Sequence, residues 1–362
     1  MRNILCAILL VCAVVSCAWA DVAINEENFP DDNFRAFVYA ADKDKEGEDG
    51  HGILSDSELA AITRMGVYEE NIESLKGIEY FTNLVYLDCA NNPISELDLS
   101  SNTALAYLDC SYNDLSSLDI SANTALQMLD CRGNRLSVLD ISANPVLEQL
   151  YCQGNSITAL DTSGNEAIEA LVCSGNPITE LDLTANTALV SLDCQSTDIV
   201  TIDTSKNAAL ESLYAKNTGL TAVDLTNNPA LKRINFEYCQ LTEIDLSKNT
   251  ALQHIALTHN QLAELNLASN MYVEELYCGD NDIEELDLRN HAALRYVSCE
   301  GNQLARLDVS GCTELQILFC WRNMLTELDL SGSPKLFMLR CESNRLTTLD
   351  LSQNVSLDTA YG

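Results

Sequence analysis

The sequence predicts a right-handed solenoid whose parallel β-sheet lines a concave face, preceded by a small helical cap. Three observations predict this fold. An aliphatic residue recurs every 21 residues from Leu84 to Leu357, through thirteen full steps without an insertion. Within this unit, Cys recurs at the sixth position and Asn at the ninth, each in ten of the thirteen repeats. Self-similarity at a short fixed period is the signature of coils that stack on their neighbours to enclose a core.

The first 20 residues indicate a signal peptide. Arg2 supplies a positive start, and Ile4 to Val15 form an apolar stretch too short to span a bilayer comfortably. Ala18-Trp19-Ala20 then offers the small-x-small pattern that signal peptidase accepts, which leaves Asp21 as the mature N-terminus.

An alternative processing site lies slightly earlier. The segment Val14 to Cys17 resembles a bacterial lipobox, in which Cys17 is lipidated and becomes the first residue. No later segment is apolar enough to cross a membrane, so a lipid on Cys17 is the only membrane attachment that the sequence suggests.

Residues 21 to 61 are expected to cover the apolar end of the solenoid with two helices. The first has Asp31 or Asp32 as its N-cap, and its apolar face is formed by Phe29, Phe34, Phe37 and Val38. The second begins at Ser55, because Ser55-Asp56-Ser57-Glu58 has the pattern of a capping box.

The acidic, glycine-rich stretch from Asp42 to Leu54 resembles the loop of an EF-hand. Calcium needs about six oxygens from a loop of about twelve residues. With Glu58 in the twelfth position, Gly52 falls at the sixth, but His51 takes a position that ordinarily supplies an oxygen. Asp42 and Asp44 reach the first and third positions only if five residues are inserted. We therefore expect an EF-hand-like cap that keeps its geometry without metal, and calcium held by Asp42, Asp44 and Glu58 is the alternative.

The repeats begin after the cap. Residues 62–83 form a diverged first repeat, thirteen regular repeats follow over 84–356, and residues 357–362 open a further one. The unit L-x-x-L-x-C-x-x-N-x-[LI]-x-x-L-D-L-S-x-N-x-x identifies leucine-rich repeats. Around Leu108-Asp109-Cys110 it predicts a short strand whose alternate side chains point in and out.

Two polar columns are expected to support the coils. The Asn at position nine should satisfy the backbone of the turn that leaves the strand, because a buried amide must be hydrogen-bonded. Position fifteen is Asp in twelve of thirteen repeats, from Asp98 to Asp350, with Asn266 as the exception. With Ser or Thr two residues later and Asn four later, this pattern indicates turn capping on the convex side. An acidic calcium-binding ladder is the alternative.

The cysteine column is expected to hold free, buried thiols. Neighbouring Cβ atoms on in-register parallel strands lie about 4.8 Å apart, whereas a disulfide needs roughly 3.5–4.5 Å. No His or carboxylate pattern converges on the column, so a metal site is not predicted.

Charge and motif content exclude several function classes. A formal net charge of −34 repels nucleic acid and anionic membrane surfaces. The four histidines are not accompanied by a nucleophile elbow, a phosphate loop or a zinc signature, although His254 and His259 share the concave face. We therefore do not predict an enzyme.

Candidate binding residues lie at positions three, five, seven and eight, which face the concave side. Asp88, Asp109 and Asp130 form a column whose mutual repulsion predicts binding of a cation or a basic partner. Within four later turns the sequence gathers aromatic, Arg and Met side chains, which is the composition of binding hot spots: Tyr277, Tyr296, Phe319, Trp321, Arg322, Met338 and Arg340. The alternative is that these aromatics only pack across neighbouring strands.

Repeats six to nine depart from the unit together. The Asn column contains Thr197, Thr218 and Cys239, and the Cys column contains Ala215, Phe236 and Leu257. We predict a local change of curvature or a softer segment in these repeats.

The unit with Cys at position six resembles the cysteine-ladder branch of the internalin-like bacterial surface leucine-rich-repeat proteins, from Leu84 to Gly362 and into the cap. The resemblance implies a bacterial origin, a curved solenoid, and adhesion or host-protein binding on the concave face. The sequence departs from the family by showing no C-terminal immunoglobulin-like module or wall anchor, so surface attachment is not implied.

We therefore expect an exported, non-catalytic scaffold that binds a protein or a glycan, secreted or held at the cell surface or in the periplasm of a bacterium. The alternative is a structural component of the cell envelope, stabilised by calcium and without a dedicated external ligand. Neither function requires a cofactor. The C-terminal edge of the sheet has no cap like that of the N-terminus, and because an open edge invites pairing, a dimer through this edge is a further expectation.

Overall fold

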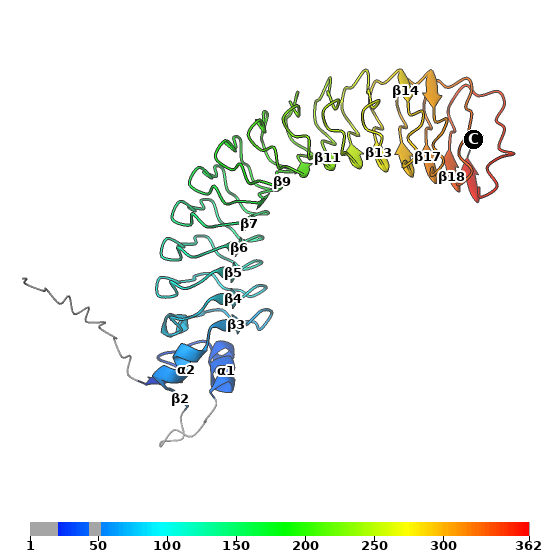
Figure 1. The fold of residues 1–362 in the computed structure, drawn as a ribbon. Helices are drawn as coiled ribbons and strands as arrows, with labels where there is room; N and C mark the ends of the chain where they lie inside the picture. Colours follow the sequence, from blue (N-terminus) through cyan, green and yellow to red (C-terminus); the bar gives the residue numbers. More distant parts are fainter. Residues whose placement is uncertain (1–20, 43–51, 362) are drawn as a thin grey trace, which may run out of the picture.

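The computed structural model describes residues 21–42 and 52–361 and shows an arch of stacked coils (Figure 1). The main strands line the inner side of the arch. The predicted signal peptide, Cys17 and Asp44 lie outside the described residues. Within the described ranges, no helix is both long and apolar enough to pass through a bilayer.

Two short helices form the cap. Helix α1 (Asp32–Ala41) begins after Asp31, whose carboxylate accepts hydrogen bonds from two backbone N–H groups of the first turn. Helix α2 (Asp56–Ala61) begins after Ser55 and has the predicted capping box with Glu58. Both predicted helix starts are therefore confirmed.

Aromatic side chains join the cap to the first coil. The rings of Phe29 and Phe34 meet edge to face with centroids 5.9 Å apart, and Phe29 also lies 6.4 Å from Phe81. All three rings are fully buried. Gly77 has a left-handed φ of 106° beside Phe29, where a Cβ atom would come within 2.3 Å of the ring. This close approach requires glycine.

A 15-stranded parallel sheet runs along the inner side of the arch. It starts with β3 (Arg64–Gly66) of the diverged first repeat and ends with β19 (Thr359–Tyr361). Each regular repeat contributes one in-register strand: β4 (Tyr86–Asp88), β5 (Tyr107–Asp109), β6 (Met128–Asp130), β7 (Gln149–Tyr151), β8 (Ala170–Val172), β9 (Ser191–Asp193), β10 (Ser212–Tyr214), β11 (Arg233–Asn235), β12 (His254–Ala256), β13 (Glu275–Tyr277), β15 (Tyr296–Ser298), β17 (Ile317–Phe319) and β18 (Met338–Arg340). The predicted parallel sheet on the concave face is confirmed.

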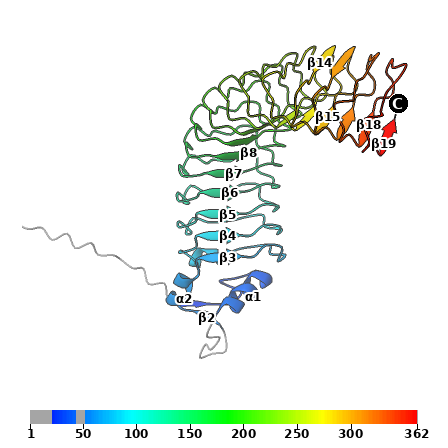
Figure 2. The same cartoon turned by 45° about the vertical axis from the view of Figure 1, so that its right-hand side comes forward.

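The remaining elements are short. Strands β1 (Val22–Ala23) and β2 (Ile53–Leu54) pair antiparallel in the cap, and a 3-10 helix, η1 (Ile78–Tyr80), follows β3. On the outer side, β14 (Glu285–Asp287) and β16 (Arg306–Asp308) pair in parallel, across the coils from β15 and β18 (Figure 2). Where strands pair on both sides, the rise per coil is equal inside and outside. This part of the arch is accordingly almost straight in Figure 1.

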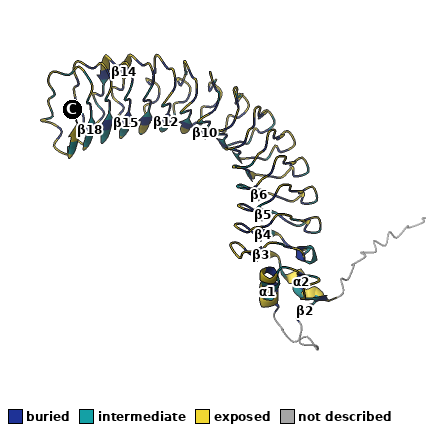
Figure 3. Ribbon diagram, turned by 180° about the vertical axis from the view of Figure 1, so that it is seen from behind, coloured by how far each residue is buried: buried dark blue, intermediate teal, exposed yellow. Residues whose placement is uncertain are grey.

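The inner strands separate a buried core from a partly exposed wall (Figure 3). In most of them the central residue is buried and its two neighbours are not, as in β5. The cysteine column belongs to the core. All twelve cysteines of the described residues are buried and free, which confirms the predicted ladder of reduced thiols.

The ladder thiols are expected to be unreactive in the folded protein. Burial raises the pKa of Cys152 and Cys194 to about 12, so almost no thiolate is present at neutral pH. Treatment with N-ethylmaleimide followed by peptide mapping should leave the ladder unlabelled in buffer and label it fully in denaturant. Labelling of the native ladder, or recovery of disulfide-linked ladder peptides, would contradict this structure.

The Asn at position nine connects adjacent coils, as Asn113 illustrates. Its side-chain amide donates to the carbonyl oxygens of Cys89 and Cys110 at 3.0 Å, and its Oδ1 accepts the backbone N–H of Ile94 at 3.1 Å. The predicted role of this column is therefore confirmed, and it extends to the backbone of the preceding coil.

The Asn at position nineteen forms a second ladder inside the coils. Asn123 is fully buried, and its amide donates to the carbonyl oxygens of Leu99 at 3.1 Å and Asn102 at 2.9 Å. The predicted turn capping is made across coils, because both acceptors lie in the outer turn of the preceding coil. The side chain points inward because the carbonyl groups of the preceding coil are its partners.

The arch changes direction between β7 and β11 (Figure 1), a stretch that overlaps the irregular repeats. Thr197 and Thr218 donate to carbonyl oxygens of their own coils, those of Cys194 at 2.7 Å and Ala215 at 2.8 Å, and the Thr218 hydroxyl also lies 3.3 Å from Cys239 Sγ of the next coil. Among the described contacts, neither hydroxyl reaches the carbonyl of the preceding coil as Asn does. The predicted change of curvature is therefore present. The softer segment stays a prediction, and hydrogen exchange should be faster here than in the flanking coils.

The Asp at position fifteen caps the outer turn. Asp140 Oδ1 accepts the backbone N–H of Ser142 at 2.9 Å, and Asn266 makes the same bond to Ala268 at 3.0 Å. Hydrogen bonds from the side chain and backbone of Ser142 hold the pKa of Asp140 below its ordinary value of 3.8. The predicted turn capping by this Asp is confirmed.

This column should make stability depend on acidic pH. A pKa lowered by folding means that the unfolded chain binds more protons near pH 4, so the stabilisation is present above this pH and lost as the pH falls through the lowered values. Asn makes the same bond without titrating. Replacing four such residues by Asn (Asp119, Asp140, Asp161 and Asp182) should therefore flatten the fall in melting temperature between about pH 5 and pH 2. An unchanged acid profile would show that these caps do not titrate as described.

Candidate binding surface

The inner wall of the arch carries columns of side chains at fixed repeat positions. Because the strands pair in register, equal positions on neighbouring strands lie side by side, about 4.8 Å apart. The registered pairs Tyr277↔Ser298 and Ser298↔Phe319 show this alignment in the late repeats. Side chains that are 21 residues apart in the sequence therefore form one continuous surface.

We call the seven predicted residues of the late repeats the late concave patch, and the structure brings them together. The rings of Tyr277 and Tyr296 stack with centroids 4.7 Å apart. The Tyr296 and Phe319 rings meet edge to face at 5.7 Å. Met338 is half-buried on β18 and pairs in register with Ile317 on β17.

Two guanidinium groups complete this patch around Trp321. The Arg322 and Arg340 guanidinium carbons lie 5.2 Å and 5.0 Å from the indole centroid. Arg340 Nε also donates to Glu342 at 2.9 Å, and Arg322 lies 3.9 Å from Asp280. Cation–π contacts and ion pairs thus hold both Arg side chains in place.

Packing between strands and availability for binding therefore coexist in this patch. The rings contact one another, as the packing alternative predicts, yet the side chains at its centre remain partly exposed. Burial and Glu275, which accepts its hydroxyl at 3.2 Å, together raise the pKa of Tyr277 to about 12. The phenols are accordingly neutral hydrogen-bond donors at physiological pH.

Sequence reasoning left out two aromatic contacts that extend this surface. The His254 ring lies 5.3 Å from the Tyr277 ring, and the Tyr238 and His259 rings lie tilted against each other at 4.4 Å. The two histidines thus contact different aromatic residues. Both histidines occupy positions that face the concave side, three and eight of the repeat, so the sequence pattern could have indicated these contacts.

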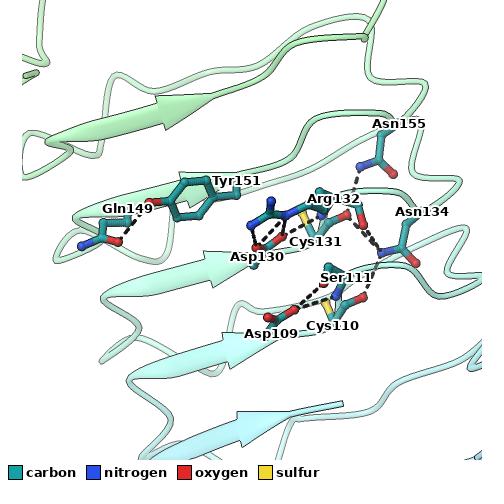
Figure 4. A network of polar contacts seen from close by, with 10 residues as sticks. All are labelled: Asp109, Cys110, Ser111, Asp130, Cys131, Arg132, Asn134, Gln149, Tyr151 and Asn155. Carbon is teal, nitrogen blue, oxygen red and sulfur yellow. Dashed lines mark hydrogen bonds and ion pairs between the residues drawn. The ribbon is translucent and has the colours of Figure 1, made fainter. Parts of the chain in front are cut away.

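The early Asp column differs from the expectation of three uncompensated carboxylates (Figure 4). Asp130 is almost completely buried and pairs with the guanidinium of Arg132. Asp109 accepts the Ser111 hydroxyl at 2.6 Å, and burial, followed by the charges of Asp130 and Asp88, raises its pKa. Arg132, at position seven of the same repeat, folds back onto the strand and pairs with Asp130. One carboxylate of the column therefore already has a counter-ion within the protein.

The structure describes two of the three candidate calcium ligands in the cap. Asp42 is buried at the C-terminal end of α1. Glu58 Oε2 accepts the backbone N–H of Ser55 at 3.0 Å and its hydroxyl at 2.8 Å. The third, Asp44, lies outside the described residues. Calcium at Glu58 would compete with the capping box.

The arch and its thiol ladder match a solved structure. The functional domain of InlJ from Listeria monocytogenes, which includes a cysteine ladder, is 36% identical with a TM-score of 0.89, and the match covers 95% of this chain and 77% of that one. The chain belongs to the internalin-like leucine-rich-repeat proteins. The resemblance stated from the 21-residue unit is thereby confirmed.

Further comparisons agree with this family. Internalin J of Listeria monocytogenes is 39% identical over 75 residues, which span 21% of this internalin-like chain and 8% of that protein. An internalin (inlF) of the same species is 22% identical, with a TM-score of 0.78 over 95% of this chain and 98% of that one. No protein-family model matches the sequence.

A more distant likeness is to a plant receptor. The ectodomain of the Arabidopsis thaliana receptor kinase GASSHO1/SCHENGEN3, solved in complex with Casparian strip integrity factor 2, is 21% identical. The match covers 78% of this chain and 42% of the receptor chain, with a TM-score of 0.67. At this identity the likeness shows the leucine-rich-repeat fold alone.

Proposed function

We propose that this internalin-like protein is an exported, non-catalytic scaffold that binds a partner protein through the late concave patch. The observation that carries the proposal is the grouping of four aromatic rings and two guanidinium groups on neighbouring strands. Aromatic and Arg side chains supply most of the binding energy in protein interfaces. Because these side chains already contact one another, a partner would order few of them on binding, which lowers the entropic cost.

We favour a protein partner over a glycan because aromatic and Arg side chains are typical of protein interfaces. The plant receptor with the same repeat fold was solved in complex with Casparian strip integrity factor 2. The solved structures of InlJ and of the internalin inlF share the leucine-rich-repeat fold, and InlJ includes a cysteine ladder. Export is supported by the predicted signal peptide, and the bacterial relatives support secretion or display at a bacterial surface.

The test is a capture experiment with two matched substitutions. The wild type, Trp321→Ala and Tyr272→Ala would each be immobilised and exposed to candidate partner proteins. Tyr272 is a strongly exposed aromatic residue outside the inner strands, so its variant controls for loss of a surface ring. We expect the wild type and Tyr272→Ala to retain the same protein and Trp321→Ala to lose it. Equal capture by all three would exclude the late concave patch as the binding site.

Calcium in the cap is a separate proposal. Asp42, Asp44 and Glu58 would supply carboxylate oxygens, and the bound ion would tie the end of α1 to the start of α2. A melting curve with calcium and with a chelator tests this proposal. A higher melting temperature in calcium, abolished by Glu58→Gln, supports it, and coincident curves would refute it.

A further inference from the structure

Beside the late concave patch, Glu300 is a carboxylate without a positively charged partner among the described residues. The other inner-wall carboxylates of these repeats are paired with cationic or imidazole groups: Glu237 with Lys216, Glu275 with His254, Asp280 with His259 and Arg322, and Glu342 with Arg340. Glu300, within the described residues, makes no ion pair and instead accepts the Ser298 hydroxyl at 2.6 Å. A half-buried carboxylate therefore stands uncompensated at the centre of the surface.

The Glu300 carboxylate occupies a space left free by the preceding repeat, which we call the Glu300 seat. Position seven of the preceding repeat is Gly279, and a Cβ atom there would lie 2.8 Å from Glu300 Oε1. The carboxylate thus occupies the space that a side chain at position 279 would fill. Gly279 does not have a positive φ, so its backbone conformation does not require glycine, and the absence of a side chain serves Glu300.

The repeat register places aromatic residues on both sides of this seat. Tyr277 and Tyr296 precede Gly279 and Ser298 on adjacent strands, and Trp321 occupies position seven of the following repeat. Burial raises the pKa of Tyr296, and the nearby charge of Glu300 raises it further. A cation placed here would be attracted by the charge of the carboxylate and by the negative faces of the aromatic rings.

We propose that Glu300 receives an arginine or lysine side chain of the partner protein. This inference rests on the proposed function and defines the chemistry of its partner. The protein's own cations do not fill the seat, because Arg340 is held by Glu342 and Arg322 lies near Asp280. The formal net charge of −34 further favours a basic partner surface.

The proposal can be tested without the natural partner. The full chain contains two tryptophans, so a Trp19→Phe background leaves Trp321, in the column of Glu300, as the only indole. Its fluorescence would be followed during titration with acetyl-Gly-Arg-Gly-amide and with the same peptide carrying uncharged citrulline. The variants are Glu300→Gln, Gly279→Ala and, as a matched charge control on the outer strand β14, Glu285→Gln.

We expect the arginine peptide to bind more tightly than the citrulline peptide. Glu300→Gln should weaken binding of the arginine peptide by about 5- to 10-fold. Gly279→Ala should also weaken this binding, because its methyl group displaces the carboxylate. Glu285→Gln should leave the affinity unchanged. Unchanged melting temperatures would show that the variants are folded. Equal binding of both peptides, or equal weakening by Glu300→Gln and Glu285→Gln, would overturn the proposal.

The outcome is separable from that of the proposed function. If Trp321→Ala abolishes capture of a partner but Glu300→Gln does not weaken the arginine peptide, the patch binds a protein and the assigned chemistry is wrong. If the arginine peptide depends on Glu300 but capture is unaffected by Trp321→Ala, the cation seat exists and the proposed function fails.

Discussion

Replacing Phe236 with alanine is expected to destabilise the solenoid by about 3–5 kcal/mol. Phe236 is fully buried and occupies the cysteine column directly after β11, within the irregular repeats. Its neighbours in this column are Ala215, which is small, and Leu257, so truncation leaves a cavity that they cannot fill without backbone movement. Phe236→Cys should also destabilise, although it restores the consensus of the repeat. The measurement is the free energy of unfolding in denaturant.

A second Phe→Ala variant tests whether the loss of stability comes from buried packing or from removal of any aromatic ring. Phe337 is partly exposed, so Phe337→Ala should change stability by much less than Phe236→Ala. If Phe236→Cys were neutral or stabilising, the core around Phe236 would not be packed as described.

Replacing Asn113 with alanine is expected to cost about 3 kcal/mol. The substitution removes the only described acceptor of the Ile94 N–H, which remains buried, whereas the Cys110 carbonyl keeps the amide of Asn134. The loss should therefore come from one unsatisfied N–H and from broken bonds between coils. Because each coil contacts only its neighbours, amide exchange should accelerate on both sides of position 113.

The control for this ladder is an exposed asparagine on the outer side. Asn227→Ala should leave stability and exchange nearly unchanged, because this residue lies in an outer turn and is exposed. Uniform acceleration of exchange along the whole chain after Asn113→Ala would contradict the coil-by-coil coupling.

Period and composition were sufficient to predict the architecture. The 21-residue step places a parallel strand in every repeat, and the polar and thiol columns follow from which positions face inward. The helix N-caps Asp31 and Ser55 were also predictable, because capping depends on neighbours within four residues.

Features that depend on contacts between coils could not be predicted in this way. The inward position of Asn123 depends on the carbonyl of Leu99, which lies 24 residues earlier. Likewise, the Thr162 hydroxyl donates to Asn186 Oδ1 at 2.7 Å, a contact that no local pattern indicates. The columns of the late concave patch were predicted, but the seat of Glu300 over Gly279 requires the geometry.

The central claim is that the inner wall of the late repeats is the binding face. Hydroxyl-radical footprinting of the protein alone and in complex with its captured partner tests it most directly, because the reagent oxidises aromatic and Met side chains on both sides of the arch. We predict reduced oxidation of Tyr277, Trp321 and Met338 in the complex and unchanged oxidation of Met271 and Tyr272, which lie outside the inner strands. Protection of Met271 and Tyr272 with unchanged oxidation of Trp321 would contradict the account.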